Sequence, residues 1–218
     1  MPIPEEFKAP FHFHQHYHIT FRSIDGIPLF KTINERSFFL EKWKRFTEMI
    51  FETWAYCLLS NHTHIIIQIK SQEQIIEALS QLMDDSKSIA VKKFLEQPSE
   101  DLFQRAVERQ INSFMVSYAN TYNNYSERKG GVFQQPFRRS LIADDAHLQQ
   151  AVICTHANAQ KHRLVKNFID YPHHSYHSIL NGNTTFVNVQ AVLAFFGSRE
   201  NFIQRHKDQI DYFYNDED

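Results

Sequence analysis

Two histidines separated by one residue, His62 and His64, are the side chains of this sequence best placed for metal chemistry. They open the segment 62–69, whose β-branched residues are typical of a strand. Residues two apart on a strand point to the same face, so both imidazoles project together while Ile65 and Ile67 turn to the core. Neighbouring imidazoles on one strand can chelate a divalent cation. The alternative is that the two are surface histidines at the start of a strand.

Basic residues gather in the later part of the chain, although the net charge is −2. Between positions 128 and 166 there are seven basic residues against two acidic ones. The seven are Arg128, Lys129, Arg138, Arg139, Lys161, Arg163 and Lys166. A basic region inside a neutral chain is typical of a phosphate-binding face, although a solvated charged surface has the same composition.

A second run of alternating histidines comprises His12, His14, His16 and His18. It could hold another metal ion, but no acidic or cysteine residue lies near it in the sequence. We interpret it as a polar strand face that can turn toward nucleic acid. The histidine pair at 173–174 lies in a predicted loop and is interpreted in the same way.

Length and composition exclude several classes of protein. A chain of 218 residues suits one domain of ordinary size. It contains no G-x-G-x-x-G and no G-x-x-x-x-G-K-[ST] motif, which argues against the usual dinucleotide and P-loop sites. Two cysteines, Cys57 and Cys154, are too few for a cysteine-rich zinc module. Because no apolar run approaches about 18 residues and no signal-peptide pattern is visible, we expect a cytoplasmic globular protein.

The elements that must position these side chains alternate between strands and helices. A strand over 15–23 and a hairpin of 53–59 with 62–69 are predicted from β-branched and aromatic alternation. An edge strand is predicted over 132–142, because its proline cannot donate to a neighbouring strand. Helical spacing predicts helices that begin at Asn34 and that cover 72–83, 101–125, about 145–160, 189–196 and 199–210. The polar segment 84–100 is expected to be a flexible insertion. This order indicates an α+β fold with helices packed on one face of an antiparallel sheet.

Four segments of the chain, taken together, match motifs of one family. Residues 58–67, LLSNHTHIII, look like the signature MPNHxHLLL. Residues 128–139, RKGGVFQQPFRR, resemble RxGxLFQxRFKR, and residues 171–176, YPHHSY, resemble YPxSSY. Residues 196–202, FGSRENF, are similar to a tail found in longer members. The matches keep the family order from about Tyr17 to His206, so the chain resembles the HUH single-tyrosine transposases, and in particular their REP-associated branch.

The resemblance implies a ferredoxin-like sheet with the two histidines on a central strand. It also implies Mg²⁺ or Mn²⁺, a third polar ligand on a late helix, and a tyrosine on that helix that attacks single-stranded DNA. We accordingly expect an N-terminal arm at 1–10, a catalytic and DNA-binding domain at 11–180, and a C-terminal helical extension at 181–218.

The late helix departs from the family at its nucleophile. The family motif YIxxNP matches residues 154–159, so Asn158 stands at the position of the metal ligand and Cys154 at that of the tyrosine. A thiolate is poorly suited to phosphodiester attack, and an inert packed cysteine is the simpler interpretation. Tyr118, Tyr122 and Tyr125 share one helical face, and such a stripe is more typical of a core or a base-stacking surface than of a nucleophile.

The resulting hypothesis is a transposase-like protein that binds single-stranded or hairpin DNA, with nicking and strand transfer lost or impaired. The catalytic positions are His62, His64 and Cys154, and the metal ligands His62, His64 and Asn158. The residues expected to contact DNA are Arg128, Lys129, Arg138, Arg139, Lys161, His162 and Lys166. Two alternatives stay open: a metal-dependent hydrolase that uses a metal-bound water with His156 as base, and a domesticated, non-catalytic DNA-binding regulator. Sequence does not decide between a monomer and a homodimer.

Overall fold

The computed structural model describes residues 7–214, with side chains through residue 210. The first six positions of the predicted arm and the last four of the predicted extension therefore lie outside the described residues. Within residues 7–214, no helix combines the length and the apolarity that a membrane crossing requires.

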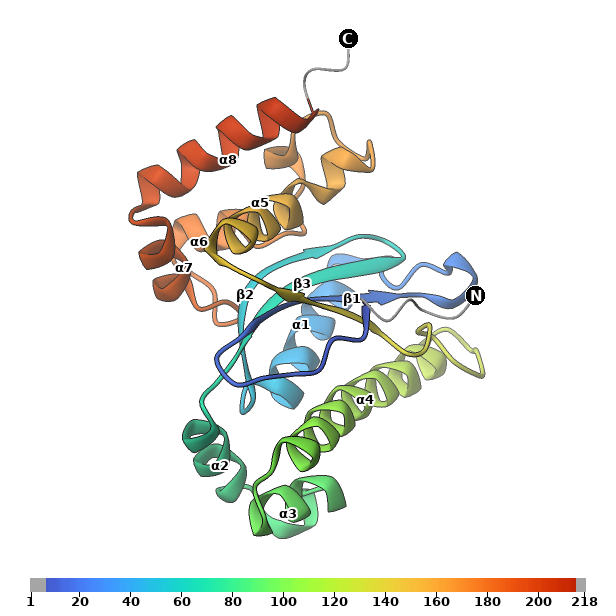
Figure 1. Ribbon diagram of the computed structural model, residues 1–218. Helices are drawn as coiled ribbons and strands as arrows, with labels where there is room; N and C mark the ends of the chain where they lie inside the picture. Colours follow the sequence, from blue (N-terminus) through green and yellow to red (C-terminus); the bar gives the residue numbers. More distant parts are fainter. Residues whose placement is uncertain (1–6, 215–218) are drawn as a thin grey trace.

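A four-stranded antiparallel sheet in the order β2-β3-β1-β4 forms the centre of the fold (Figure 1). The strands are β1 (His16–Arg22), β2 (Phe51–Leu58), β3 (His62–Ile69) and β4 (Arg138–Ile142). This sheet confirms the predicted hairpin of β2 with β3 and the predicted edge position of β4. β4 is shorter than the predicted 132–142, and begins two residues after Pro136.

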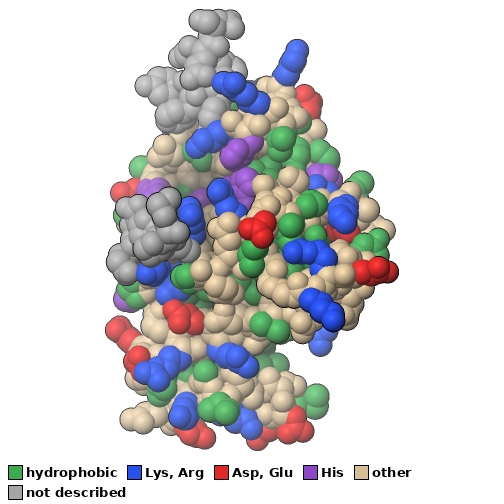
Figure 2. All heavy atoms as spheres, turned by 90° about the vertical axis from the view of Figure 1, so that its right-hand side faces the viewer, with side chains coloured by type: hydrophobic (Ala, Val, Ile, Leu, Met, Phe, Trp, Pro, Cys, Tyr) green, Lys and Arg blue, Asp and Glu red, His purple; other side chains and the backbone are tan. Residues whose placement is uncertain are grey.

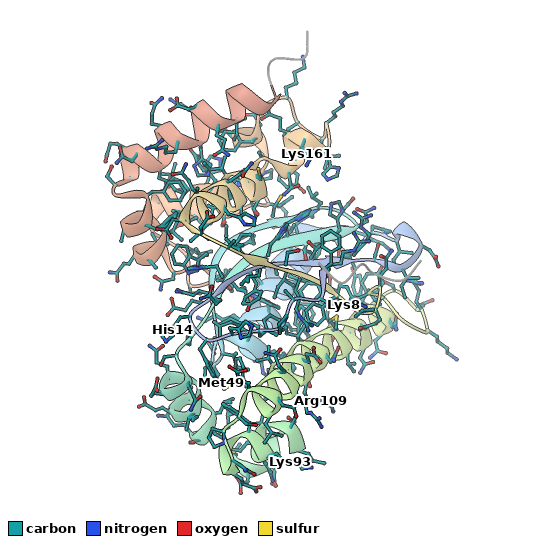
Figure 3. All side chains as sticks on the ribbon, in the orientation of Figure 1. Lys8, His14, Met49, Lys93, Arg109 and Lys161 are labelled. Carbon is teal, nitrogen blue, oxygen red and sulfur yellow. The ribbon has the colours of Figure 1, made fainter. Side chains whose placement is uncertain are left out.

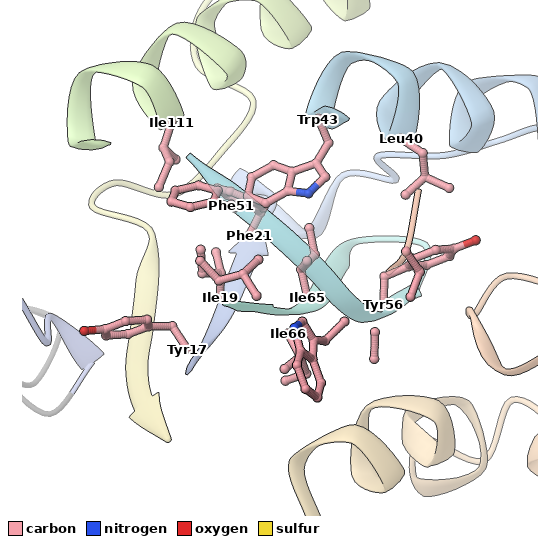
Figure 4. Packing of buried hydrophobic residues seen from close by; sticks show 14 of the residues in the cluster. Tyr17, Ile19, Phe21, Leu40, Trp43, Phe51, Tyr56, Ile65, Ile66 and Ile111 are labelled. Carbon is pink, nitrogen blue, oxygen red and sulfur yellow. The ribbon is translucent and has the colours of Figure 1, made fainter. Parts of the chain in front are cut away.

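One face of the sheet packs on α1 (Ile33–Thr47) and α4 (Glu100–Tyr125), on the lower side in Figure 1. Phe21 of β1 contacts Trp43 and Phe114 of these helices, with ring centroids 5.7 and 5.5 Å apart. The isoleucines 65, 67 and 69 of β3 are fully buried, as their alternation predicts. Figure 4 shows this aromatic core around the strands. Its burial supplies most of the driving force for folding.

The opposite face carries α5 (Asp145–Lys161), which packs across β2 and β3 (Figure 1). The predicted α+β fold with an antiparallel sheet is confirmed, but helices cover both faces of the sheet, whereas the sequence predicted helices on one face. The physical reason is that this second face is itself apolar beyond the histidines. Cys57 and Ile66 lie on it in register with β3 and β1, and both are fully buried. A sheet face with such residues must be covered.

Three further helices follow the short turn η4 (Phe168–Asp170): α6 (Tyr176–Asn181), α7 (Val189–Phe196) and α8 (Arg199–Tyr214) (Figure 1). α7 contacts the edge strand β2, and α6 packs on α7. The predicted helices at 189–196 and 199–210 are confirmed. α8 packs along α5, joined to it by a hydrogen bond between His206 and His156.

The segment expected to be a flexible insertion is structured. After α2 (Gln72–Ser80) it forms η3 (Asp84–Ser86) and α3 (Ile89–Glu96). Val91 and Phe94 are buried, and the Phe94 ring lies 5.7 Å from that of Phe103 on α4. Two apolar side chains at helical spacing were enough to dock an otherwise polar segment.

Candidate metal centre and nucleic-acid face

Three histidines meet at one end of the sheet. His62 and His64 lie on β3, and His162 caps the C-terminal end of α5. One ring nitrogen from each lies within 4.8 Å of the others, the spacing of a group that can hold a metal ion. Strand alternation places the first two on one face, and the docking of α5 across β3 brings the third. His162, expected at the DNA-contacting face, thus belongs to this triad; its side chain is exposed, so the site opens to solvent.

Hydrogen bonds orient two of the rings. Nδ1 of His62 donates to Asn61 Oδ1 at 2.7 Å, and Nδ1 of His64 lies 2.8 Å from Nε2 of His18. The Nε2 atoms of His62 and His64 are buried and lack any hydrogen-bond partner. A buried polar atom without a partner is costly, and a bound cation would supply one. The residues therefore fit a metal ion.

The pKa values of these rings favour the neutral imidazole, which is the form that binds a metal ion. Burial lowers the pKa of His62 to about 4, and His162 and Arg22 add to the effect. Burial likewise holds the pKa of His64 well below its ordinary value, assisted by His18. Neutral imidazole is the species that binds metals, so the site is ready for a cation at neutral pH.

β1 contributes residues that sequence reasoning did not assign to the site. His18 touches His64, and Arg22 pairs in register with His62, so its exposed side chain lies on the same face. The alternation of His16, His18 and Arg22 was the available signal. His12 lies before the strand and is exposed.

The face of α5 that leads to His162 carries Asn158 and Cys154, one and two turns earlier. Asn158 is buried, and its Nδ2 donates to Thr155 O at 3.4 Å. Cys154 is half-buried and forms no disulfide. The two positions matched to the transposase motif thus share a helical face with a member of the triad.

His156, the residue considered as a general base, lies elsewhere. It is fully buried, with its ring nitrogens 2.8 Å from His206 Nε2 and from Ser175 Oγ. On α5 it occupies the face opposite Cys154, since a two-residue step turns about 200°. It therefore serves the packing of α8 on α5, and the structure does not support its role as a base.

The tyrosine stripe of α4 is part of the core at two of its three positions. Tyr118 donates to Leu29 O at 2.9 Å and Tyr122 to Pro28 O at 2.8 Å, and both rings are buried. Burial raises the pKa of Tyr118, which disfavours its phenolate. Tyr125 is 73% exposed.

Most of the predicted DNA-contacting residues have accessible side chains. Lys129, Lys161 and Lys166 are exposed, and Arg128 and Arg138 are half-buried. In Figure 2 histidines lie among Lys and Arg side chains in the upper part of the face, and Figure 3 labels Lys161 at the end of α5.

Arg139 is the exception and corrects the prediction. It pairs with Ile19 in the sheet and so faces the core side, with 9% of its surface exposed. Its guanidinium donates to Glu108 Oε1 and to Ala9 O, each at 2.6 Å, and lies 4.7 Å from the Phe11 ring centroid. These contacts are structural and leave it unable to meet a DNA backbone.

Comparison with known proteins agrees with the motif resemblance. No family profile matches the sequence. A Haemophilus influenzae protein assigned by inference as a REP-associated tyrosine transposase is 27% identical over 127 residues, which is 58% of this chain. The match spans 60% of that relative's length. The solved structure of a REP-associated tyrosine transposase bound to a REP hairpin covers 83% of this chain and 88% of its own, with a TM-score of 0.52 and 18% identity. The two share a fold, and the predicted similarity to REP-associated transposases is confirmed.

Proposed function

We propose that this chain is a transposase-like protein that binds single-stranded or hairpin DNA across the end of the sheet that carries His62, His64 and His162. The observation that carries the proposal is the pair of buried, unpartnered Nε2 atoms in the triad, with the exposed Arg22 in register beside His62. The likeness to a transposase bound to a REP hairpin supports the class of ligand.

The resemblance implies Mg²⁺ or Mn²⁺ at this site, with His62, His64 and Asn158 as ligands. A bound divalent ion neutralises charge on a phosphate oxygen. The chain's own contribution is to hold the imidazoles neutral and oriented through Asn61 and His18, and to keep the site open to solvent at His162.

The basic residues near the triad position the DNA backbone. Lys129, Lys161 and Lys166 are exposed, and their cationic ends are suited to phosphate contacts. Arg22 adds a cation directly beside His62. Binding that depends on such contacts weakens with salt, by about 0.7 log units per log of salt for each phosphate neutralised on single strands.

DNA nicking is lost or impaired in this proposal because Cys154 occupies the nucleophile position. Cys154 shares its helical face with Asn158 and His162, so the scaffold for a nucleophile persists. A tyrosine hydroxyl reaches farther from the backbone than a thiol and can approach a phosphate held at the triad.

Hairpin binding is tested by mobility shift of a labelled hairpin with a single-stranded foot over a salt titration. The proposal expects a salt-dependent shift by the wild-type protein and no covalent adduct on a denaturing gel. Absence of a shift with every hairpin and single strand would refute the DNA-binding role.

The lost-nucleophile part is tested by Cys154→Tyr with Mn²⁺ or Mg²⁺. We expect a slowly migrating protein–DNA adduct, and its disappearance when His62→Ala is combined with Cys154→Tyr. A wild-type adduct that maps to a tyrosine of α4 would contradict this account.

A further inference from the structure

The third ligand position is where this chain departs from the resemblance. The motif match assigns it to Asn158, whereas among the histidine, cysteine and acidic side chains of the described residues three imidazoles bring their ligand atoms together: His62, His64 and His162. Asn158 lies one turn earlier, and its amide nitrogen donates to the helix backbone at Thr155.

We propose that the metal site of this chain is a three-imidazole site, His62–His64–His162, that selects a borderline transition-metal ion such as Zn²⁺ or Co²⁺ over Mg²⁺. The proposal rests on the proposed function only in placing a metal at the triad. It concerns which residues bind the ion and which ion they prefer.

The position of His162 supports its role. It is the C-cap of α5, and its own N–H is already bonded to Asn158 O and Gln160 O, which anchors its backbone. Its ring centroid lies 5.0 Å from that of His62. The carbonyl end of a helix carries a partial negative charge, which favours a cation beside it.

The donor set determines the ion. Imidazole nitrogen suits Zn²⁺, Co²⁺ and Ni²⁺, whereas Mg²⁺ prefers oxygen ligands and gives up its water reluctantly. Three histidines with an open position are typical of zinc sites that bind a further ligand from solvent. The exposure of His162 leaves such an opening.

His18 and Asn61 act as positioning residues for the ligands. Asn61 Oδ1 accepts from His62 Nδ1, which leaves the lone pair of His62 on Nε2. His64 Nδ1 donates in the same way to His18 Nε2, 2.8 Å away, when His64 Nε2 binds the ion. Loss of such a partner typically lowers metal affinity by about 10–100-fold.

The test is isothermal titration of chelator-stripped, full-length protein with Zn²⁺, Co²⁺ and Mg²⁺ separately, together with the visible absorption of bound Co²⁺. We expect one Zn²⁺ or Co²⁺ per chain, with Mg²⁺ weaker by more than about 100-fold. His162→Ala should weaken Zn²⁺ more than Asn158→Ala does, and should change the Co²⁺ spectrum. His18→Phe should weaken Zn²⁺ by about 10–100-fold.

Exposed His12→Ala is the matched control and should leave the titration unchanged. Circular dichroism of each variant verifies folding, and Asn158→Ala supplies a second variant on the same helix face. Equal affinity for Mg²⁺ and Zn²⁺, or a larger loss in Asn158→Ala than in His162→Ala, would overturn the inference.

A mobility shift on the same samples keeps the two proposals apart. Zn²⁺ binding without any DNA binding would overturn the proposed function and leave this inference standing. DNA binding with no metal binding to the wild-type protein would overturn this inference and leave the proposed DNA-binding function standing.

Discussion

Lowering the pH from about 7.5 to about 5.5 should destabilise this protein through three buried histidines at and beside the contact of α5 with α8. His156, His174 and His206 are all buried. His206 Nδ1 donates to Phe202 O at 2.7 Å, so its Nε2 must accept from His156 Nδ1, 2.8 Å away. His156 Nε2 in turn accepts from Ser175 Oγ at 2.8 Å. A proton added to this series of hydrogen-bonded histidines breaks a hydrogen bond and buries a charge.

The direction and the size of this change in the free energy of unfolding follow from the pKa values. Burial lowers the pKa of His206 from 6.5 to about 3 and that of His174 to about 4, and holds that of His156 well below 6.5. The unfolded chain therefore binds more protons, so this contribution is complete above pH 6.5 and is lost as the pH falls toward 4. Each such histidine removes on the order of 1 kcal/mol per pH unit in this window, so the group removes a few kcal/mol by about pH 5.5. That is a large part of an ordinary total stability of about 5–15 kcal/mol.

The assay is urea unfolding followed by circular dichroism at several pH values in chelator. His206→Gln removes one of the three sites, so its unfolding free energy should fall by about 1 kcal/mol less than that of the wild type between these two pH values. The histidines of the sheet face whose pKa values are also lowered are present in both proteins, so their effect on the pH dependence cancels in the comparison. His12→Gln, at an exposed position, should keep the wild-type pH slope. A His206→Gln slope equal to the wild-type slope would refute the reasoning, as would nuclear magnetic resonance titration of native His206 near 6.5.

Three further outcomes are expected. Arg139→Leu should lower the free energy of unfolding by about 2–3 kcal/mol in urea melts, because it removes the ion pair with Glu108, while the salt slope of hairpin binding stays unchanged; an unaltered melt would contradict this. Lys161→Ala should reduce the salt slope of hairpin binding by about 0.7, whereas Lys93→Ala, at the α3 end of the molecule in Figure 3, should leave it unchanged. Equal effects of the two variants in a filter-binding titration would count against the proposed DNA-binding face. Phe94→Ala should cost about 3 kcal/mol by calorimetry, because α3 docks through this ring, and a loss below about 0.5 kcal/mol would mean that α3 is dispensable.

Most secondary structure could be predicted from the sequence because alternation and helical spacing are local. The hairpin of β2 and β3, the long helix α4 and the C-terminal helices were predicted within a few residues. The shared face of His62 and His64 was predicted for the same reason, since a strand's own pleat decides which side chains point together.

Tertiary structure alone decided which other residues join that pair. His162 belongs to the triad because α5 docks across β3, and His18 touches His64 because β1 lies beside β3 in one register. Arg139 faces the core side because β4 pairs it with Ile19, although its neighbours in sequence are basic surface residues. No local pattern encodes these contacts. The register between strands and the docking of a helix are determined by the burial of apolar faces far apart in the chain, and the polar groups follow.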